Sequence, residues 1–385
     1  MNNNYLPTDY QTFIATSRYA RWLEDEGRRE TWGETVHRYM RYIVYQALPS
    51  LGEPVDDYDY GALEIEIRDA ILSLEVMPSM RSLMTAGKAA DRDNTCMYNC
   101  SYLPVDDPKS FDEAMFILLC GTGVGFSVER QFITKLPDVP TLFQSDTTVV
   151  IKDSKEGWAK GLRQVLALLW AGEIPKWDVS KVRPAGARLK TFGGRASGPA
   201  PLIDLFNFSV TTFRQAQGRK LSSIECHDLM CKIGEVVVVG GVRRSAMISL
   251  SNLSDDRMRH AKSGNWWETA GHRALANNSV AYTDKPDSMS FMREWTALME
   301  SGSGERGVFN REASIKQAAK NGRRESCYEF GTNPCSEIIL RPNQFCNLTE
   351  VVVRANDSME DLTRKVRLAT ILGTIQSTYT HFPYL

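Results

Sequence analysis

The stretch GTNPCSEIIL, residues 331–340, places an asparagine, a cysteine and a glutamate at alternate positions. Shortly after it, the segment NQFCNL adds a further thiol, Cys346. In an extended segment, side chains at alternate positions point to the same side. We therefore expect the amide of Asn333, the thiol of Cys335 and the carboxylate of Glu337 to face one spot, as the groups of an active site would.

The whole chain has the composition of a soluble globular protein. Its 385 residues exceed one ordinary domain, and 42% of them are hydrophobic and 24% charged. A net charge of −1 predicts no general attraction to nucleic acid or to a membrane. The chain has no apolar run of about 18 residues, and its first residues lack the pattern of a signal peptide. We expect a cytoplasmic protein, in the producing cell or in an infected host.

Eight cysteines in such a protein are expected to be mostly reduced, so a disulfide here would be transient and catalytic. Cys96 and Cys100 are spaced CxxxC, and Cys226 and Cys231 are spaced CxxxxC. Neither pair has the CxxC spacing of a zinc knuckle, and only His227 lies near either. We expect no metal site.

Helical and strand patterns alternate along the chain. Residues up to about 85 read as helical, with Trp32, Val36, Tyr39, Met40 and Ile43 spaced as the buried face of a helix. TCMYNCSYLPV is a strand pattern, Ser110 and Glu113 form a capping box, and GFSVER reads as the next strand. Between them, Gly121, Gly123 and Gly125 end the helix. A tight turn explains these glycines better than a nucleotide loop, since the order of elements is the reverse of a dinucleotide-binding unit.

The second half of the chain continues the alternation. Ser222 and Glu225 cap a helix, and the arginines of GGVRRSAMISL suit either solvent or a phosphate or base. We expect further helices and strands at the following segments: a helix at 201–216, strands at 276–282 and 307–312, a helix at 288–300 that ends at Gly302 and Gly304, and a long helix from about 358. This alternation predicts an α/β fold with a partly parallel sheet.

Six of these motifs together resemble one family, the catalytic subunit of ribonucleotide reductase. NPCSE followed by FCNL is similar to its finger loop, and YNCSYLPV with GTGVGFSVER resembles its first barrel strand and the helix, turn and strand that follow. FGGRASGPAPL and GGVRRSA resemble its two specificity loops, while ANNSVA and GVFNRE fall in the family's order. Overall likeness is greatest to the monomeric, adenosylcobalamin-dependent (class II) ribonucleoside-triphosphate reductases, from about residue 22 to the last residue.

The resemblance implies a role for each residue of the opening pattern. Cys335 would be the thiyl radical that removes the ribose 3′ hydrogen, Glu337 the general base for the 3′-hydroxyl, and Asn333 the group that holds the ribose hydroxyls. Cys100 and Cys346 would supply two electrons by forming a disulfide, with Cys96 as a competitor for Cys100.

Further residues implied by the resemblance bind substrate or effector. Ser101 would join Asn333 and Glu337 in substrate binding. The two loops would bind a deoxynucleotide effector through Gly193, Gly194, Arg195, Gly241, Val242, Arg243 and Arg244. The implied partners are a ribonucleotide, adenosylcobalamin and a thioredoxin-like dithiol reductant.

The implied fold is a ten-stranded α/β barrel of two halves with a central finger loop, of which this chain holds the first half. We expect a helical region at 1–85, the first half-barrel at 86–330, the finger loop at 331–350 and the start of the second half at 351–385. The second half-barrel, with its phosphate loop, much of the cobalamin site and a C-terminal cysteine pair, has no counterpart here. The chain is therefore expected to be a fragment, one half of a split enzyme or a shortened enzyme.

Two other functions compete with this interpretation. A glycyl-radical enzyme of the same superfamily would carry a radical glycine near its C-terminus, and none is seen. A nucleotide-binding relative without chemistry would have little reason to keep all five catalytic residues. An inactive half that needs a separate C-terminal half for activity stays an alternative. Within this chain, no motif separates class I from class II, or a diphosphate from a triphosphate substrate.

Overall fold

The computed structural model describes residues 6–47, 60–187, 195–239, 246–322 and 324–385, and it divides into two compact units. The first unit comprises Met1–Asn99 and Asn347–Pro383, and the second comprises Cys100–Cys346 and Tyr384–Leu385. This division differs from the boundaries expected at residues 85, 330 and 350, since residues 347–383 group with the N-terminal residues. Each unit is described by itself.

The first unit is mainly helical. Its longest N-terminal helical stretch runs through α2, η2 and α3, and Trp32, Val36, Tyr39, Met40 and Ile43 are all buried on it, as predicted. A capping box of Thr31 and Glu34 fixes its start. The elements of this unit are α1 (Asp9–Ile14), η1 (Ala15–Tyr19), β1 (Trp22–Leu23), β2 (Arg28–Arg29), α2 (Trp32–Tyr39), η2 (Met40–Val44), α3 (Tyr45–Ala47), α4 (Tyr60–Leu72), β3 (Val76–Pro78), α5 (Met80–Thr85), α6 (Lys88–Arg92), η4 (Asn94–Met97), β14 (Thr349–Val351) and α16 (Met359–Ser377).

The second unit is built on a six-stranded sheet with the order β10-β9-β8-β5-β4-β13. Neighbouring strands from β10 to β4 are parallel, whereas β13 runs antiparallel to β4. The α/β prediction is thereby confirmed. The strands of this sheet are β4 (Cys100–Pro104), β5 (Gly123–Ser127), β8 (Met247–Asn252), β9 (Ala276–Tyr282), β10 (Gly307–Asn310) and β13 (Gln344–Cys346).

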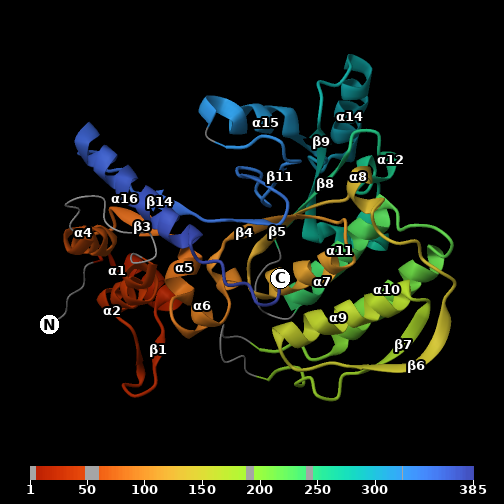
Figure 1. The fold of residues 1–385 in the computed structure, drawn as a ribbon, viewed down its shortest axis with the longest axis horizontal. Helices are drawn as coiled ribbons and strands as arrows, with labels where there is room; N and C mark the ends of the chain where they lie inside the picture. Colours follow the sequence, from red (N-terminus) through yellow and green to blue (C-terminus); the bar gives the residue numbers. More distant parts are fainter. Residues whose placement is uncertain (1–5, 48–59, 188–194, 240–245, 323) are drawn as a thin grey trace. The chain divides into compact units, whose positions relative to one another are not determined.

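Helices cover one face of this sheet, and a hairpin covers the other (Figure 1). Leucines, valines and phenylalanines of α7, α9, α10 and α11 form the main core on the helical face. On the opposite face, Tyr102, Leu250 and Phe309 pack with Leu340 of the hairpin. The remaining elements of this unit are α7 (Lys109–Leu119), α8 (Arg130–Ile133), β6 (Phe143–Val150), α9 (Lys155–Trp170), β7 (Glu173–Asp178), α10 (Ala200–Gln215), α11 (Ser223–Val239), α12 (Asp256–Arg259), α13 (Trp266–Thr269), η5 (Gly271–Leu275), α14 (Ser288–Ser301), α15 (Arg311–Ala319), η6 (Lys320–Gly322), β11 (Gly331–Thr332) and β12 (Ile339–Leu340).

Several local predictions differ from the structure. The strand predicted at 307–312 ends at Asn310, directly before α15, and residues 95–97 of the predicted strand TCMYNCSYLPV belong to η4. Two further differences have a clear physical reason. Ser110 does not cap α7, because it lies inside the helix and its hydroxyl donates to the carbonyl of Pro104 at 3.0 Å. The chain turns only at Gly121, whose φ is 82°, whereas Gly123 and Gly125 are residues of β5. The Ser222–Glu225 cap of α11 is confirmed, because Glu225 accepts from the Ser222 backbone and hydroxyl at 2.7 Å.

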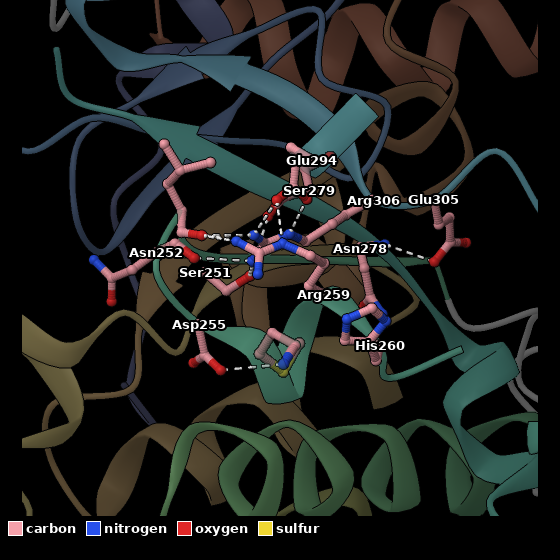
Figure 2. A network of polar contacts seen from close by, with 12 residues as sticks. Ser251, Asn252, Asp255, Arg259, His260, Asn278, Ser279, Glu294, Glu305 and Arg306 are labelled. Atoms are coloured by element: carbon pink, nitrogen blue, oxygen red, sulfur yellow. Dashed lines mark hydrogen bonds and ion pairs between the residues drawn. The ribbon is translucent and has the colours of Figure 1, made fainter. Parts of the chain in front are cut away.

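A buried polar network fixes α14 to the carboxyl end of β8. Figure 2 shows Arg306 between Glu294 of α14 and the Ser251–Asn252 end of β8. Its guanidinium donates to Glu294 at 2.6 and 2.7 Å and to the Ser251 hydroxyl and Asn252 carbonyl at 2.9 Å. Because both side chains of the ion pair are almost fully buried, removing Glu294 would leave Arg306 without a carboxylate partner in the interior, whereas Glu294 without Arg306 would still pair with Arg259 at 2.9 Å.

Among the described residues, no helix combines the length and apolar character needed to cross a membrane.

Candidate active site

The cysteine of the opening stretch lies at the tip of a hairpin. Strands β11 and β12 pair antiparallel, with Gly331 opposite Leu340 and Thr332 opposite Ile339. Between them the backbone N–H of Ser336 donates to the carbonyl of Asn333 at 3.0 Å, which closes a four-residue turn over Pro334 and Cys335. We call residues 331–340 the cysteine hairpin.

The expected extended form of this stretch is therefore wrong. Proline favours the first central position of such a turn because its ring fixes φ, and Ser336 follows with a φ of 68°. The turn exposes the Cys335 thiol and the Glu337 side chain, while Asn333 stays buried. The three groups thus come from a turn and its base, and not from one side of a strand.

Asn333 carries a polar group that the described part of the protein does not satisfy. Its side-chain oxygen accepts from the Ile338 backbone at 3.0 Å, and this contact fixes the amide. Its amide nitrogen is buried and has no hydrogen-bond partner among the described residues. Buried polar groups in proteins are nearly always paired, so an unpaired donor here suits a ligand with an acceptor, such as a hydroxyl oxygen.

Cys100 and Cys346 lie directly opposite each other on two neighbouring strands of the sheet. They are Cα partners in the antiparallel pair of β4 and β13, where opposite residues lie about 4.5–5.5 Å apart. That separation is within the range of disulfides, and the two thiols are not joined in the structure. The pKa of Cys346 is raised above its ordinary value, first by its hydrogen bond with Cys100 and then by burial. Cys346 therefore stays a protonated thiol at neutral pH.

The cysteine hairpin lies close to this dithiol. A side-chain carbon placed on Gly123 would lie 2.9 Å from Pro334 Cγ and 3.4 Å from Cys100 Sγ, so both atoms share the space above this glycine. Glu337, two residues after Cys335 in the same hairpin, adds a small electrostatic contribution to the raised pKa of Cys346, after the Cys100 hydrogen bond and burial. The structure thus brings Cys100, Cys346, Glu337 and the turn that carries Cys335 to one place.

Two glycines permit this close approach. A side-chain carbon at Gly125 would lie 1.8 Å from the carbonyl oxygen of Thr332, and one at Gly331 would lie 2.1 Å from the ring of Tyr102. Neither distance is sterically possible. Gly125 and Gly331 therefore let the hairpin backbone lie directly on β4 and β5, and in the GTGVGF motif this is the role of Gly125.

We expect Gly125→Ala to displace the cysteine hairpin. The added methyl group would overlap the Thr332 carbonyl, and overpacking of this kind typically costs about 1–3 kcal/mol of unfolding free energy. Urea denaturation measures this loss. Gly271→Ala is the matched control, because a side-chain carbon at Gly271 has no atom within 4 Å. Equal stability of the two variants would contradict the proposed close packing.

Other predicted residues lie elsewhere or outside the described residues. Ser101 points to the face opposite Cys100, and its hydroxyl donates to the Gly123 carbonyl at 3.0 Å, so its side chain does not join the groups at the turn. Cys96, the competitor of Cys100, lies in η4, and its thiol donates to the Asp93 carbonyl at 3.3 Å. Arg195 is exposed and donates to the Gly186 carbonyl at 3.0 Å. The following residues of the two loops lie outside the described residues: Gly193, Gly194, Gly241, Val242, Arg243 and Arg244.

The sequence predicts no metal site at either cysteine pair, Cys96 with Cys100 or Cys226 with Cys231. In the ranges that the structure describes, no group of three or more His, Cys, Asp or Glu side chains could hold a metal ion. The sequence analysis assigned no element between residues 131 and 191, where β6, α9 and β7 lie. It also gave no role to Glu129 and Arg311, although both are charged residues within motifs that it singled out.

Comparison with known proteins supports the resemblance. Residues 135–211 match the family described as the insertion domain of B12-dependent ribonucleotide reductase. Adenosylcobalamin-dependent ribonucleoside-triphosphate reductases of Lacticaseibacillus paracasei and Lactobacillus leichmannii are each 30% identical to the chain, over 86% of it and 53% of the relative. The chain therefore spans about half the length of the curated relatives it matches.

Solved structures show the same fold. The crystal structure of a B12-dependent (class II) ribonucleotide reductase superposes with a TM-score of 0.78 and 23% identity, over 96% of this chain and 59% of that one. The alpha subunit of a class Id ribonucleotide reductase from Actinobacillus ureae gives a TM-score of 0.51 at 12% identity. These findings confirm the resemblance to ribonucleotide reductases, and they favour the class II type.

Proposed function

We propose that this chain carries the thiol chemistry of an adenosylcobalamin-dependent ribonucleoside-triphosphate reductase, which makes deoxyribonucleotides for DNA synthesis. The observation that carries the proposal is the cross-strand pair of Cys100 and Cys346 beside the turn that exposes Cys335. The unpaired amide of Asn333 and the carboxylate of Glu337 lie at the same turn. A reaction that needs one thiyl, one base, one hydrogen-bond donor and one dithiol uses all five residues.

The proposed reaction assigns one step to each group. A thiyl at Cys335 takes the ribose 3′ hydrogen, while Glu337 accepts the 3′-hydroxyl proton and Asn333 donates a hydrogen bond to the sugar. The 2′-hydroxyl leaves as water after taking the proton of one of the two thiols, Cys100 or Cys346. The two sulfurs then give two electrons and the remaining thiol proton to the 2′ carbon and become a disulfide. Cys335 finally returns its hydrogen to the 3′ carbon and Glu337 returns its proton to the 3′ oxygen, so that the thiyl and the carboxylate are restored.

The exposure of Cys335 suits a radical source that lies outside the cysteine hairpin. Cys335 is exposed at a turn, so a group outside the hairpin can reach its hydrogen atom, whereas Cys346 is buried. Adenosylcobalamin would supply, when bound, the radical that converts Cys335 to its thiyl. The resemblance places much of the cobalamin site in the second half-barrel, beyond the residues present here.

The half-barrel and finger loop are proposed on the same grounds. Five parallel strands and one antiparallel strand suit a first half-barrel and the start of a second, and the cysteine hairpin suits a finger loop. A second half, on the same or another polypeptide, would complete the site. A thioredoxin-like dithiol would reduce the Cys100–Cys346 disulfide again, and a deoxynucleotide would act at the two loops.

An assay with defined components tests the function. The chain is combined with the C-terminal part that its longer relatives have. It is then given a ribonucleoside triphosphate, dithiothreitol and adenosylcobalamin, and the deoxynucleotide that forms is measured. We expect product only when the cobalamin is present. Activity that depends on a di-iron or di-manganese protein would overturn the class assignment. Nucleotide binding without any product would favour a non-catalytic relative.

We expect Cys346→Ser to uncouple the reaction and not to stop it. Cys335 would still take the 3′ hydrogen, but the sugar radical would find no dithiol and would break down. Free base should therefore appear in place of deoxynucleotide, as chromatography of the products would show. Cys226→Ser is a control, since Cys226 is also a buried thiol but belongs to the core of the helical face. Normal product from Cys346→Ser would contradict the dithiol assignment.

A further inference from the structure

A buried ion pair joins two motifs whose roles the proposed function leaves open. Glu129 follows β5 in GVGFSVER, and Arg311 follows β10 in GVFNRE. The Arg311 guanidinium donates to both carboxylate oxygens of Glu129, at 2.8 and 2.6 Å. The exposed fractions of the two side chains are 2% and 0%. This is the two-point geometry in which arginine and carboxylate bind most strongly.

The same guanidinium reaches the base of the cysteine hairpin. Arg311 Nε donates to the carbonyl of Phe330 at 2.7 Å, and Phe330 is fully buried and directly precedes Gly331. One side chain thus links the end of β5, the start of α15 and the first strand of the hairpin. Gly331 lies against the ring of Tyr102, so this hydrogen bond and this close contact both act at the base of the hairpin.

Further contacts hold Glu129 in place. The Ser127 hydroxyl donates to it at 2.7 Å and the Gln131 amide at 3.1 Å. Gln131 in turn accepts from the Asn252 amide at 3.3 Å, and Asn252 belongs to the network around Arg306 shown in Figure 2. The hairpin is therefore connected by hydrogen bonds to a buried polar layer at the carboxyl ends of β5 and β8.

Stability alone does not account for this pair. Replacing a buried ion pair by apolar side chains of similar size is often neutral or stabilising, because both charges lose their hydration on burial. Apolar side chains would not donate to the Phe330 carbonyl, so the directional contact is what the arginine adds. A reacting group displaced by about 1 Å can lose about 100-fold in rate, which makes the position of Cys335 sensitive to such a contact.

We propose that Glu129 and Arg311 are positioning residues that fix the cysteine hairpin, and with it Cys335, over the Cys100–Cys346 dithiol. Among the described residues, their side-chain hydrogen bonds go to each other, to Ser127, Gln131 and Phe330, and to none of the five proposed catalytic residues. This inference rests on the proposed function for the meaning of Cys335, but its test uses neither substrate nor cofactor.

The test measures the mobility of the hairpin directly. In a Cys100→Ser, Cys327→Ser background, Cys335 is the one cysteine that is not buried, and a nitroxide is attached to it. The test variant is Glu129→Leu with Arg311→Met. Its control is Glu294→Leu with Arg306→Met, which removes a similarly buried ion pair that does not contact the hairpin and reaches Glu129 only through Asn252 and Gln131. Arg259, which loses Glu294 in this control, keeps its ion pair with Asp256. The paired substitutions leave no charge alone in the interior.

We expect the rotational correlation time of the nitroxide to fall about threefold in the test variant, as a fixed loop gains nanosecond motion, and to stay unchanged in the control. The single variant Arg311→Lys allows the same nitroxide measurement if the double variant does not fold. A lysine keeps the charge beside Glu129 but cannot at the same time reach the Phe330 carbonyl, so a smaller fall is expected.

A nitroxide as rigid in the Arg311 variants as in the unchanged protein would overturn the inference, and so would an equal change in the test and control pairs. Failure of the proposed function is a separate result, because it would show as absence of deoxynucleotide from the unchanged protein.

Discussion

Replacing Cys335 by serine should abolish deoxynucleotide formation. An alcohol O–H bond is too strong to take the place of the thiol, so the 3′ hydrogen of the sugar would never be removed. The loss should exceed the roughly 10²–10⁴-fold expected for a lost general base, since no other described residue is assigned to start the reaction. Product formation by the completed enzyme, followed with a radiolabelled ribonucleotide, measures it.

The position of Cys335 lets this experiment separate a loss of chemistry from a loss of folding. Cys335 is exposed at the tip of a turn, so exchange of sulfur for oxygen should leave folding unchanged. Cys327→Ser is the matched control, because Cys327 is also exposed and has no proposed role. A Cys335→Ser protein that still makes deoxynucleotide would defeat the proposed mechanism, and inactivity of both variants would point to general damage.

Much of the fold could be predicted because local patterns and tertiary structure agree. The strand at Ala276–Tyr282 and the helix at Ala200–Gln215 follow the predicted ranges to within one residue. The helix at Ser288–Ser301 ends, as expected, at Gly302, where φ is 63°. In these elements, periodicity and end signals indicate the same structure, and packing does not override them.

The geometry of the cysteine hairpin could not be predicted from periodicity. Alternation of polar residues reads as a strand, yet Pro334 and the left-handed backbone at Ser336 make a turn. The contact between Gly125 and Thr332 involves residues far apart in the chain, so no local sequence pattern predicts it. The same holds for the Glu129–Arg311 pair, whose partners are brought together only when β5 and β10 join one sheet.

The pairing of Cys100 with Cys346 is expected from the family resemblance and not from a pattern in the sequence. Their sequence separation gives no hint of contact, and only the family resemblance implied that they act together. In the structure the register of β4 and β13 places the two residues directly opposite each other. The resemblance thus supplied a long-range contact that the physical patterns of a single sequence do not contain.

Changing Glu337 to glutamine should separate the base from the thiols. The amide keeps the size of the side chain but cannot accept the 3′-hydroxyl proton, so reduction should slow by about 10²–10⁴-fold. Removal of the 3′ hydrogen by Cys335 should persist, and loss of tritium from a 3′-labelled substrate detects it. The exposed Glu300 provides the control, as Glu300→Gln should keep full activity.

The same substitution should also change Cys346. The Glu337 carboxylate helps to raise the pKa of the Cys346 thiol, because a nearby negative charge opposes formation of a thiolate. The hydrogen bond with Cys100 and burial raise this pKa more than Glu337 does and remain in the variant, so loss of the charge should lower the pKa only in part and raise the thiolate fraction modestly. Alkylation of Cys346 by iodoacetamide, mapped by mass spectrometry, should then be faster in Glu337→Gln than in Glu300→Gln. If both variants react at the same rate and reduce ribonucleotides equally fast, Glu337 is not beside the dithiol, and its role as base in this site is wrong.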